Sequence, residues 1–103
     1  MIRTDPYGPI HPGEILREEF LKPLAMSAYS AAKRMRVPRT RIERLVREET
    51  PITSDTALRL ERAFGASAEF WMGLQAEYEL EVARKAADRF SGIDRVEGLP
   101  HAA

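Results

Sequence analysis

The stretch SAYSAAKRMRVPRTRIERLVREE, residues 27–49, has the pattern of two short helices joined by a tight turn. Ser27 is a good N-cap, and the alanines that follow it recur at helical spacing with side chains small enough for another helix to approach closely. Val37-Pro38 interrupts this helix. Pro38 suits the start of the next one, because its missing N–H would have no partner there. The stretch therefore predicts one helix after Ser27 and a second over about 38–48.

The second of these helices has one apolar stripe and one basic face. Ile42, Leu45 and Val46 fall within an arc of about 100° when each residue advances by about 100°. The opposite face and its edges are polar and mostly basic: Thr40, Arg44 and Arg47, flanked by Arg39, Arg41 and Glu43. The stripe fixes which side is buried, so the basic face is predicted to point outward.

The net charge of zero conceals an uneven distribution of charge along the chain. Residues 33–47 contain seven basic side chains and one acidic one, whereas residues 67–83 contain four glutamates and no basic side chain. A charged helical face is usually only solvated, and Glu43 with Arg47 has the i, i+4 spacing of an ordinary surface pair. The cluster of basic side chains alone therefore does not indicate a function; it does so only in combination with the predicted helix pair.

Taken together, the helix pair and its basic face are typical of a helix-turn-helix, whose second helix enters the major groove of DNA. The groove is about 12 Å wide and admits one helix. Its walls are phosphates that attract Lys and Arg, and its floor presents guanine O6 and N7, which the planar fork of arginine can bind with two hydrogen bonds.

The rest of the chain predicts an all-α fold with five helices. A first helix runs from Gly13 to Lys22, before Pro23. A fourth is capped by Thr53 or Ser54 and stopped by Gly65, and a fifth starts after Ser67 and continues to about Val82. No stretch alternates with period two. We expect an arm over 1–12, one domain over 13–85, and a loosely structured tail over 86–103.

Composition excludes several classes of protein. A chain of 103 residues without cysteine, signal-like start or long apolar run is expected to be a cytoplasmic protein of one domain. His11 and His101 lie in predicted irregular ends, without clustered ligands, and no nucleophile motif or phosphate-binding glycine loop is present. Neither an enzyme nor a cofactor is predicted. His11 is expected to cap the backbone near Gly13, and Phe64, Phe70 and Trp71 to belong to the core.

Three longer motifs carry a resemblance to a known family: HPGEILREEFLKPL (11–24), SAYSAAKRMRVPRTRIERLV (27–46) and ITSDTALRLERAFGASAEFWMGLQAEYEL (52–80). Together they resemble the HigA-type antitoxins, also called VapI-like, of the Xre/lambda-repressor helix-turn-helix class. The resemblance covers residues 11–84. It implies a five-helix lambda-repressor-like domain that dimerises on an inverted-repeat operator, represses its own operon, and neutralises a HigB-like toxin that cleaves mRNA.

The resemblance also implies roles for individual residues. Base edges are expected to be contacted by Arg39, Thr40 and Arg44. Phosphates are expected to be contacted by Lys33, Arg41, Arg47, Thr53, Ser54 and Asp55, partly through backbone amides at the start of the fourth helix. The chain departs from the class at two places: Ala28 stands where Gln is common, and Arg36 stands at the turn where Gly is common. Arg36 must then adopt a left-handed conformation or change the turn.

Tyr78, Leu80 and Val82 are the candidates for the dimer contact, although Tyr78 and Val82 fit burial within one subunit equally well. The toxin could bind the tail or the first helix with Glu14, Glu18 and Glu19. Two alternatives stay open from sequence: a free-standing Xre-type regulator without a toxin, and a protein-interaction module that presents its arginine face to an acidic partner.

Overall fold

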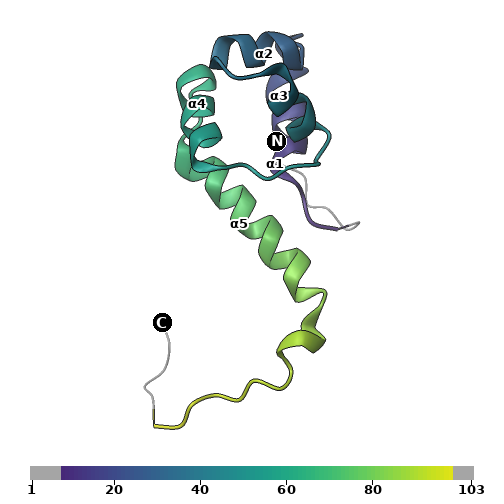
Figure 1. The fold of residues 1–103 in the computed structure, drawn as a ribbon, viewed down its shortest axis with the longest axis vertical. Helices are drawn as coiled ribbons and strands as arrows, with labels where there is room; N and C mark the ends of the chain where they lie inside the picture. Colours follow the sequence, from purple (N-terminus) through teal and green to yellow (C-terminus); the bar gives the residue numbers. More distant parts are fainter. Residues whose placement is uncertain (1–7, 99–103) are drawn as a thin grey trace.

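The computed structural model describes residues 8–98, and these contain helices and no strand. Five α-helices follow one another along these residues, as the sequence predicts, and Figure 1 shows their arrangement. Their bounds are Pro12–Ile15 (α1), Ala28–Met35 (α2), Arg39–Val46 (α3), Ser54–Phe64 (α4) and Ala68–Arg84 (α5). A π-helix, η1 (Leu16–Leu21), continues α1, and a short 3₁₀ turn, η2 (Ala87–Phe90), follows α5.

The ends of α2, α4 and α5 are fixed by local side chains, as predicted. The hydroxyls of Ser27, Thr53 and Ser67 accept hydrogen bonds from backbone N–H groups three residues later. Each bond satisfies one of the N–H groups that a first helical turn leaves without a partner. Gly65 ends α4 with a φ of 90°, a conformation that costs glycine little. These helices therefore begin, and α4 also ends, where the local sequence requires.

The first helix differs from the prediction in its start and in its helix type. It begins at Pro12 rather than Gly13, since His11 caps it by accepting a hydrogen bond from Gly13 N at 2.9 Å, the role expected for that histidine. After Ile15 the helix widens into the π-form, in which Lys22 N bonds to Arg17 O, five residues back, at 3.1 Å. A pattern read at 3.6 residues per turn does not reveal this extra residue.

Of the two alternatives for Arg36 in the α2–α3 turn, a left-handed conformation or a changed turn, the structure has the left-handed conformation. Arg36 has φ 58° and ψ 46°, so a non-glycine residue occupies the left-handed region. Pro38 is the N-cap of α3 and not its first residue, and α3 ends at Val46, two residues earlier than predicted. Glu48 has a φ of 65°, so a second left-handed residue turns the chain away soon after α3. The helix that carries the basic face thus spans eight residues.

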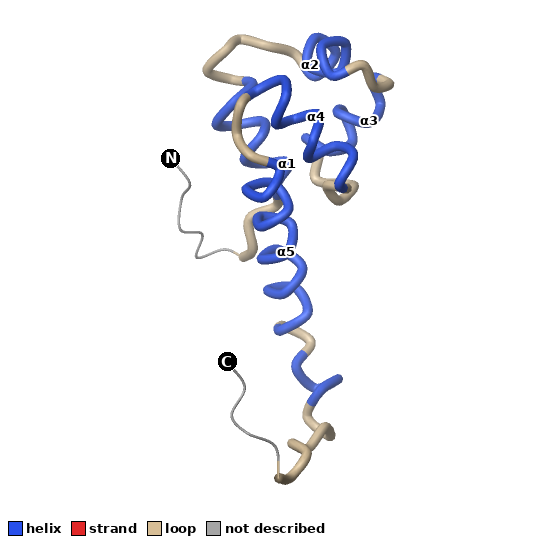
Figure 2. Tube along the Cα trace, turned by 90° about the vertical axis from the view of Figure 1, so that its left-hand side faces the viewer, coloured by secondary structure: helices blue, strands red, loops and turns tan. Residues whose placement is uncertain are grey.

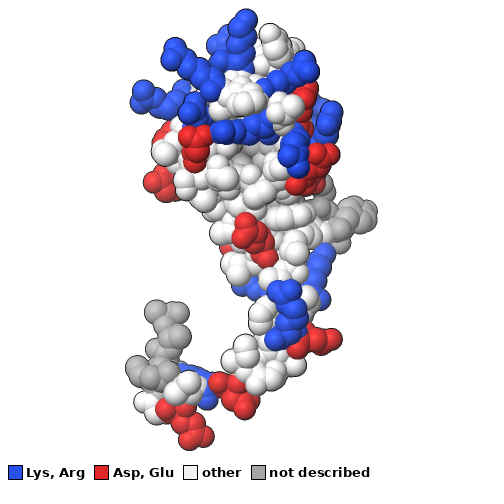
Figure 3. All heavy atoms as spheres, viewed as in Figure 1, with Lys and Arg blue, Asp and Glu red and all other residues white. Residues whose placement is uncertain are grey.

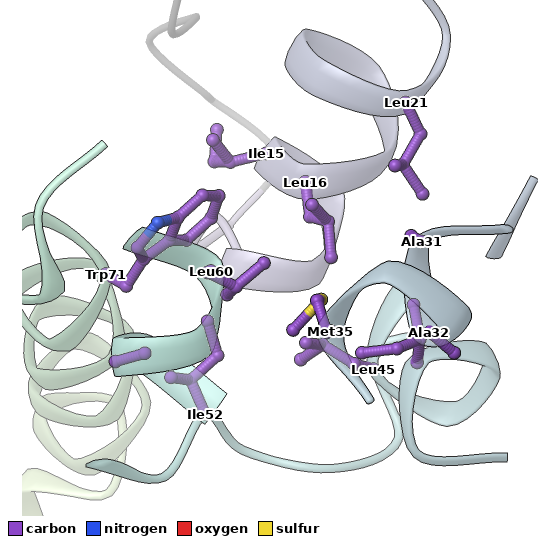
Figure 4. Packing of buried hydrophobic residues seen from close by; sticks show 12 residues of the cluster. Ile15, Leu16, Leu21, Ala31, Ala32, Met35, Leu45, Ile52, Leu60 and Trp71 are labelled. Carbon is purple, nitrogen blue, oxygen red and sulfur yellow. The ribbon is translucent and has the colours of Figure 1, made fainter. Parts of the chain in front are cut away.

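The core lies where α1 to α4 and the start of α5 meet, and Figure 4 shows its side chains converging from these helices. Trp71, Leu16, Ile42, Leu45 and Leu60 are its largest fully buried side chains. Phe64 and Phe70 are partly buried and pack against it, so the prediction that the aromatic residues belong to the core is confirmed.

One glycine allows the first helix to approach α3. A Cβ at Gly13 would lie 1.8 Å from the backbone oxygen of Leu45. Backbone cannot yield as a flexible side chain can, so only glycine fits at this crossing.

The molecule has a compact head and a projecting stem, seen side-on in Figure 2. We define the head as residues 10–78 and the stem as residues 79–98. The first half of α5 belongs to the head through buried Trp71 and Gln75, and Gln75 Oε1 accepts a hydrogen bond from Ile52 N at 2.8 Å. The principal extents of 54 × 27 × 25 Å reflect the stem, whose side chains are almost all exposed.

Candidate nucleic-acid interface

The structure orients α3 as its apolar stripe predicts. Ile42 and Leu45 are buried, with 0% and 1% of their surfaces exposed, and Val46 is partly buried. The side chains expected to meet DNA from this helix are all exposed: Arg39, Thr40, Arg41, Arg44 and Arg47. Burial of one face thus presents four arginines and a threonine on one side of a short helix.

Most of these arginines are held by neighbours. Arg39 Nε lies 3.3 Å from Glu43 Oε2, and its guanidinium lies 6.0 Å from the centroid of the Tyr29 ring on α2. Arg44 Nε lies 3.6 Å from Glu49 Oε1. Exposed pairs of this kind contribute only about 0–1 kcal/mol, so a phosphate or a guanine can replace the carboxylate at little cost.

Glu43 binds Arg39, one turn earlier on the helix, although its spacing from Arg47 would equally allow an ordinary surface pair. Within residues 8–98, Arg47 has no ion-pair partner. It follows the last residue of α3, at the C-cap, so its charge remains available to a phosphate.

A hollow of about 450 Å³ lies between α3 and the start of α4. Arg41 and Arg44 line one side, and Thr50, Thr53 and Thr56 contribute to the other. The first N–H groups of α4, at Ser54 and Asp55, belong to a helix end that carries partial positive charge. The hollow therefore presents guanidinium and hydroxyl groups, and the amides at the start of α4 follow directly after Thr53 in its lining. Groups of these kinds bind phosphate oxygens.

Asp55 is engaged by two arginines from different helices. Its Oδ2 lies 2.5 Å from Arg41 Nη1 and 3.0 Å from Arg59 Nε. Hydrogen bonds from Arg41, and then from Arg59, hold the pKa of this exposed carboxyl below its usual range. The carboxylate is therefore an acceptor already used within the protein, and any contact of Asp55 with a phosphate falls to its backbone N–H.

Positive charge gathers at one end of the molecule. Figure 3 shows Lys and Arg side chains concentrated over the α2–α4 end, whereas the stem shows both signs. Exposed Lys33, Arg34 and Arg36 extend the basic surface from α3 onto α2 and the turn. This end carries the side chains that the sequence assigned to DNA.

Two supporting residues were missed by sequence reasoning. Arg17 on η1 donates through Nη1 to the carbonyl of Val46 at the end of α3, and its Nη2 lies 3.2 Å from Glu48 Oε2. It thereby fixes the end of α3 against the first helix. Tyr29 contacts Arg39 from α2, close to Ala28, where the class often has a glutamine. No local pattern announces either residue, because each acts on a helix distant in sequence.

The three dimer candidates lie in two environments. Tyr78 is partly buried, and its ring packs edge-on against His11 with centroids 4.8 Å apart. Leu80 and Val82 are 46% and 47% exposed. Of the three, Tyr78 therefore contributes to the head of its own chain, whereas Leu80 and Val82 are exposed on the stem, two residues apart and on different sides of α5.

Among residues 8–98, no helix is long and apolar enough to cross a membrane. The same part of the chain contains no group of three or more acidic, histidine or cysteine side chains arranged to hold a metal ion.

Comparison with known proteins agrees with this geometry. A family model described as helix-turn-helix matches residues 18–71. Virulence-associated protein I of Dichelobacter nodosus is 53% identical over 76 residues, which cover 74% of this chain and 70% of that protein. Antitoxin HigA-1 of Vibrio cholerae is 32% identical over 72 residues, 70% of this chain and 68% of that one.

A solved structure, Pseudomonas aeruginosa antitoxin HigA with the higBA promoter, superposes with a TM-score of 0.79 at 42% identity. The match covers 88% of this chain and 99% of the other.

Proposed function

Since the chain belongs to the helix-turn-helix family, in its HigA-type, VapI-like branch, we propose that it is the antitoxin of a toxin–antitoxin pair and represses its own operon. In this role it binds operator DNA through α3 and neutralises a HigB-like toxin that cleaves mRNA. It is not an enzyme, and it acts in the cytoplasm, where both targets are found.

The observation that carries the DNA-binding role is the exposed basic face of α3, opposite buried Ile42 and Leu45. In the proposed complex, α3 lies in the major groove and Arg39, Thr40 and Arg44 contact base edges. The solved structure of the relative with the higBA promoter supports DNA binding by this fold. Each arginine first leaves its glutamate, an exchange that costs little at exposed sites.

Phosphate contacts come from both sides of α3. Lys33, Arg41 and Arg47 supply charge, and the start of α4, with Thr53, Ser54 and the backbone of Asp55, supplies hydroxyl and amide donors. Such contacts set position and overall affinity without reading sequence. They make binding strongly dependent on salt concentration.

The protein acts as a homodimer on an inverted repeat, because one short helix reads only a few base pairs and a two-fold pair reads two half-sites about 34 Å apart. Exposed Leu80 and Val82 on the stem form the proposed contact, and Tyr78 supports it by fixing α5 on the head. The toxin binds elsewhere, on the first helix with Glu14, Glu18 and Glu19 or on the tail.

Mobility-shift titration with the DNA upstream of the gene tests the operator role. Arg39→Ala and Arg44→Ala should each weaken operator binding by about 1–3 kcal/mol and relax sequence preference. Arg47→Ala should weaken all sequences alike and lower the salt dependence by about one phosphate. Unchanged operator binding by both base-contact variants at physiological salt would show that α3 does not read the DNA.

The antitoxin role needs a separate experiment. The full chain, added to the toxin encoded beside it, should stop cleavage of mRNA and purify with the toxin as a complex. A chain that binds its operator but has no neighbouring toxin would instead be a free-standing regulator. A chain that binds acidic proteins through the arginine face, and no DNA, would be an interaction module.

A further inference from the structure

A chain of ion pairs crosses the edge of the candidate interface and joins three helices. Arg41 on α3 and Arg59 on α4 both bind Oδ2 of Asp55, at 2.5 and 3.0 Å. Arg59 also donates through Nη1 to the carbonyl of Met35 on α2, at 2.8 Å. We call this the Arg59–Asp55–Arg41 chain. It connects the end of α2 with a side chain of the DNA-facing helix.

The Arg59 end of this chain of ion pairs is fixed. The last carbonyls of a helix have no partner within the helix, and Arg59 bonds to two of those near the end of α2, on Met35 and, at 3.4 Å, on Arg36. A cation at a helix C-terminus is also favoured by the helix dipole. Arg59 lies four residues after Asp55 on α4, the spacing at which helical side chains meet. Arg59 is therefore a fixed support for the carboxylate.

The Arg41 end of the chain of ion pairs lies at the proposed phosphate site. Arg41 lines the hollow between α3 and α4, and the bond to Asp55 occupies one of its nitrogens. The guanidinium has five N–H donors, so several remain for a phosphate. A free arginine loses up to about 2 kcal/mol of rotamer entropy when it is immobilised. An arginine already held in place loses less of it on binding DNA.

We propose that Asp55 is a positioning residue that holds Arg41 in its DNA-binding geometry, with Arg59 as the fixed support. This deepens the proposed operator binding and rests on it. It changes the expected role of the Asp55 side chain, which acts through Arg41 and does not itself contact a phosphate.

The proposal predicts the opposite sign from simple electrostatics. A carboxylate next to phosphates repels them, so on charge alone its removal strengthens DNA binding. If Asp55 positions Arg41, its removal weakens binding although the protein becomes more positive. The sign of the change therefore separates the two effects.

The test compares Asp55→Asn with Glu69→Gln in the full-length protein. Glu69 is exposed in the first turn of α5, lines a hollow together with Ser54, and has no ion-pair partner within residues 8–98. It thus gives the response to charge removal alone. In mobility-shift titrations on operator DNA, Asp55→Asn should weaken binding about threefold to fivefold, the size expected of an exposed ion pair. Glu69→Gln should leave binding unchanged or tighter.

A second readout is the dependence of affinity on salt, which counts neutralised phosphates. Asp55→Asn should make this slope shallower, toward that of Arg41→Ala. In a double-mutant cycle, Asp55→Asn should have no weakening effect once Arg41 is alanine. Thermal unfolding of each variant confirms that the titrations compare folded proteins.

Tighter binding by Asp55→Asn would overturn the proposal, because Asp55 would then hold Arg41 away from DNA. Equal weakening with and without Arg41 would also overturn it, since Asp55 would act independently of that side chain. If the wild-type protein fails to bind its operator, the proposed function itself fails. Wild-type binding together with a tighter Asp55→Asn variant leaves the function standing and rejects only the positioning role.

Discussion

The two halves of α5 are one continuous helix but have different surroundings. In the first half Trp71 is fully buried and Gln75 is 5% exposed, whereas in the second half Leu80 and Val82 are almost half exposed. The head buries apolar surface and fixes α5 by packing. The part of α5 in the stem is equally helical, but among the described residues it packs against no apolar surface. Helical sequence alone therefore does not place a helix; contacts with a second surface do.

The largest effect on the stability of the head is expected at Gly13, where the first helix crosses α3. Gly13→Ala should destabilise the protein by about 3 kcal/mol or more, because its Cβ would overlap the Leu45 carbonyl. Chemical denaturation measures the change. The matched control is Gly73→Ala, an exposed position in α5 with open space around it, which should stabilise by about 0.5–1 kcal/mol. Similar effects at the two glycines would contradict the close crossing.

The next effect concerns the bond that ties the first half of α5 to the loop before α4. Gln75→Leu should cost about 1–3 kcal/mol, since the buried N–H of Ile52 would lose its acceptor. Glu77→Leu, at an exposed position on the same helix, should change the free energy of unfolding by less than about 0.5 kcal/mol. Equal costs would show that Gln75 does not anchor α5.

A smaller effect is expected from acidification. Burial lowers the pKa of the His11 imidazole below its ordinary value of 6.5, and Glu48 and the Thr50 backbone oppose the shift only partly. The unfolded chain then takes up a proton before the folded one. Stability contributed by neutral His11 is complete above pH 6.5 and is lost as pH falls from there through the lower folded pKa.

Thermal unfolding at pH 8, 7, 6 and 5 measures this loss. His11→Asn keeps an acceptor for the N-cap and removes the titration, so the difference between the two proteins should shrink below about pH 6.5. A difference in stability between the two proteins that stays constant across this pH range would exclude His11 as the source of the pH dependence.

The smallest effect on the folding of one chain is expected in the stem. Leu80→Ser with Val82→Ser should change the unfolding free energy of the monomer, measured at low protein concentration, by less than about 0.5 kcal/mol. Sedimentation at higher concentration should nevertheless show loss of the dimer. Ile93→Ser, at a side chain 73% exposed beyond α5, serves as the control and should leave the dimer intact. If the dimer persists after the double substitution, the dimer contact does not lie at these two residues of the stem.

Much of the fold could be predicted because its determinants are local. Ser27, Thr53, Ser67 and Gly65 are cap residues whose chemistry acts within a few positions along the chain. The stripe of Ile42 and Leu45 likewise fixes the outer face of α3 by its spacing alone. The base-contact and phosphate roles of that face stay predictions until DNA binding is measured.

The features that could not be predicted join residues far apart in sequence. Arg17 and Val46 are 29 positions apart, and Arg59 and Met35 are 24 apart. The π-helix was missed because its hydrogen bonds differ by one residue from the α-helical pattern. The partner of Glu43 could not be predicted, since Arg39 and Arg47 are equally spaced from it and only the conformation of the side chains selects one.

The amino-acid sequence by itself determined the number of α-helices, the N-caps of α2, α4 and α5, and the side of α3 that is exposed, because caps and helical periodicity act over one or two turns. Only the tertiary structure decided how the arginines are held, which half of α5 is buried, and why Gly13 must be a glycine. Those outcomes depend on which surfaces meet when the helices pack. The spacing of residues along one helix does not determine its distances to the other helices.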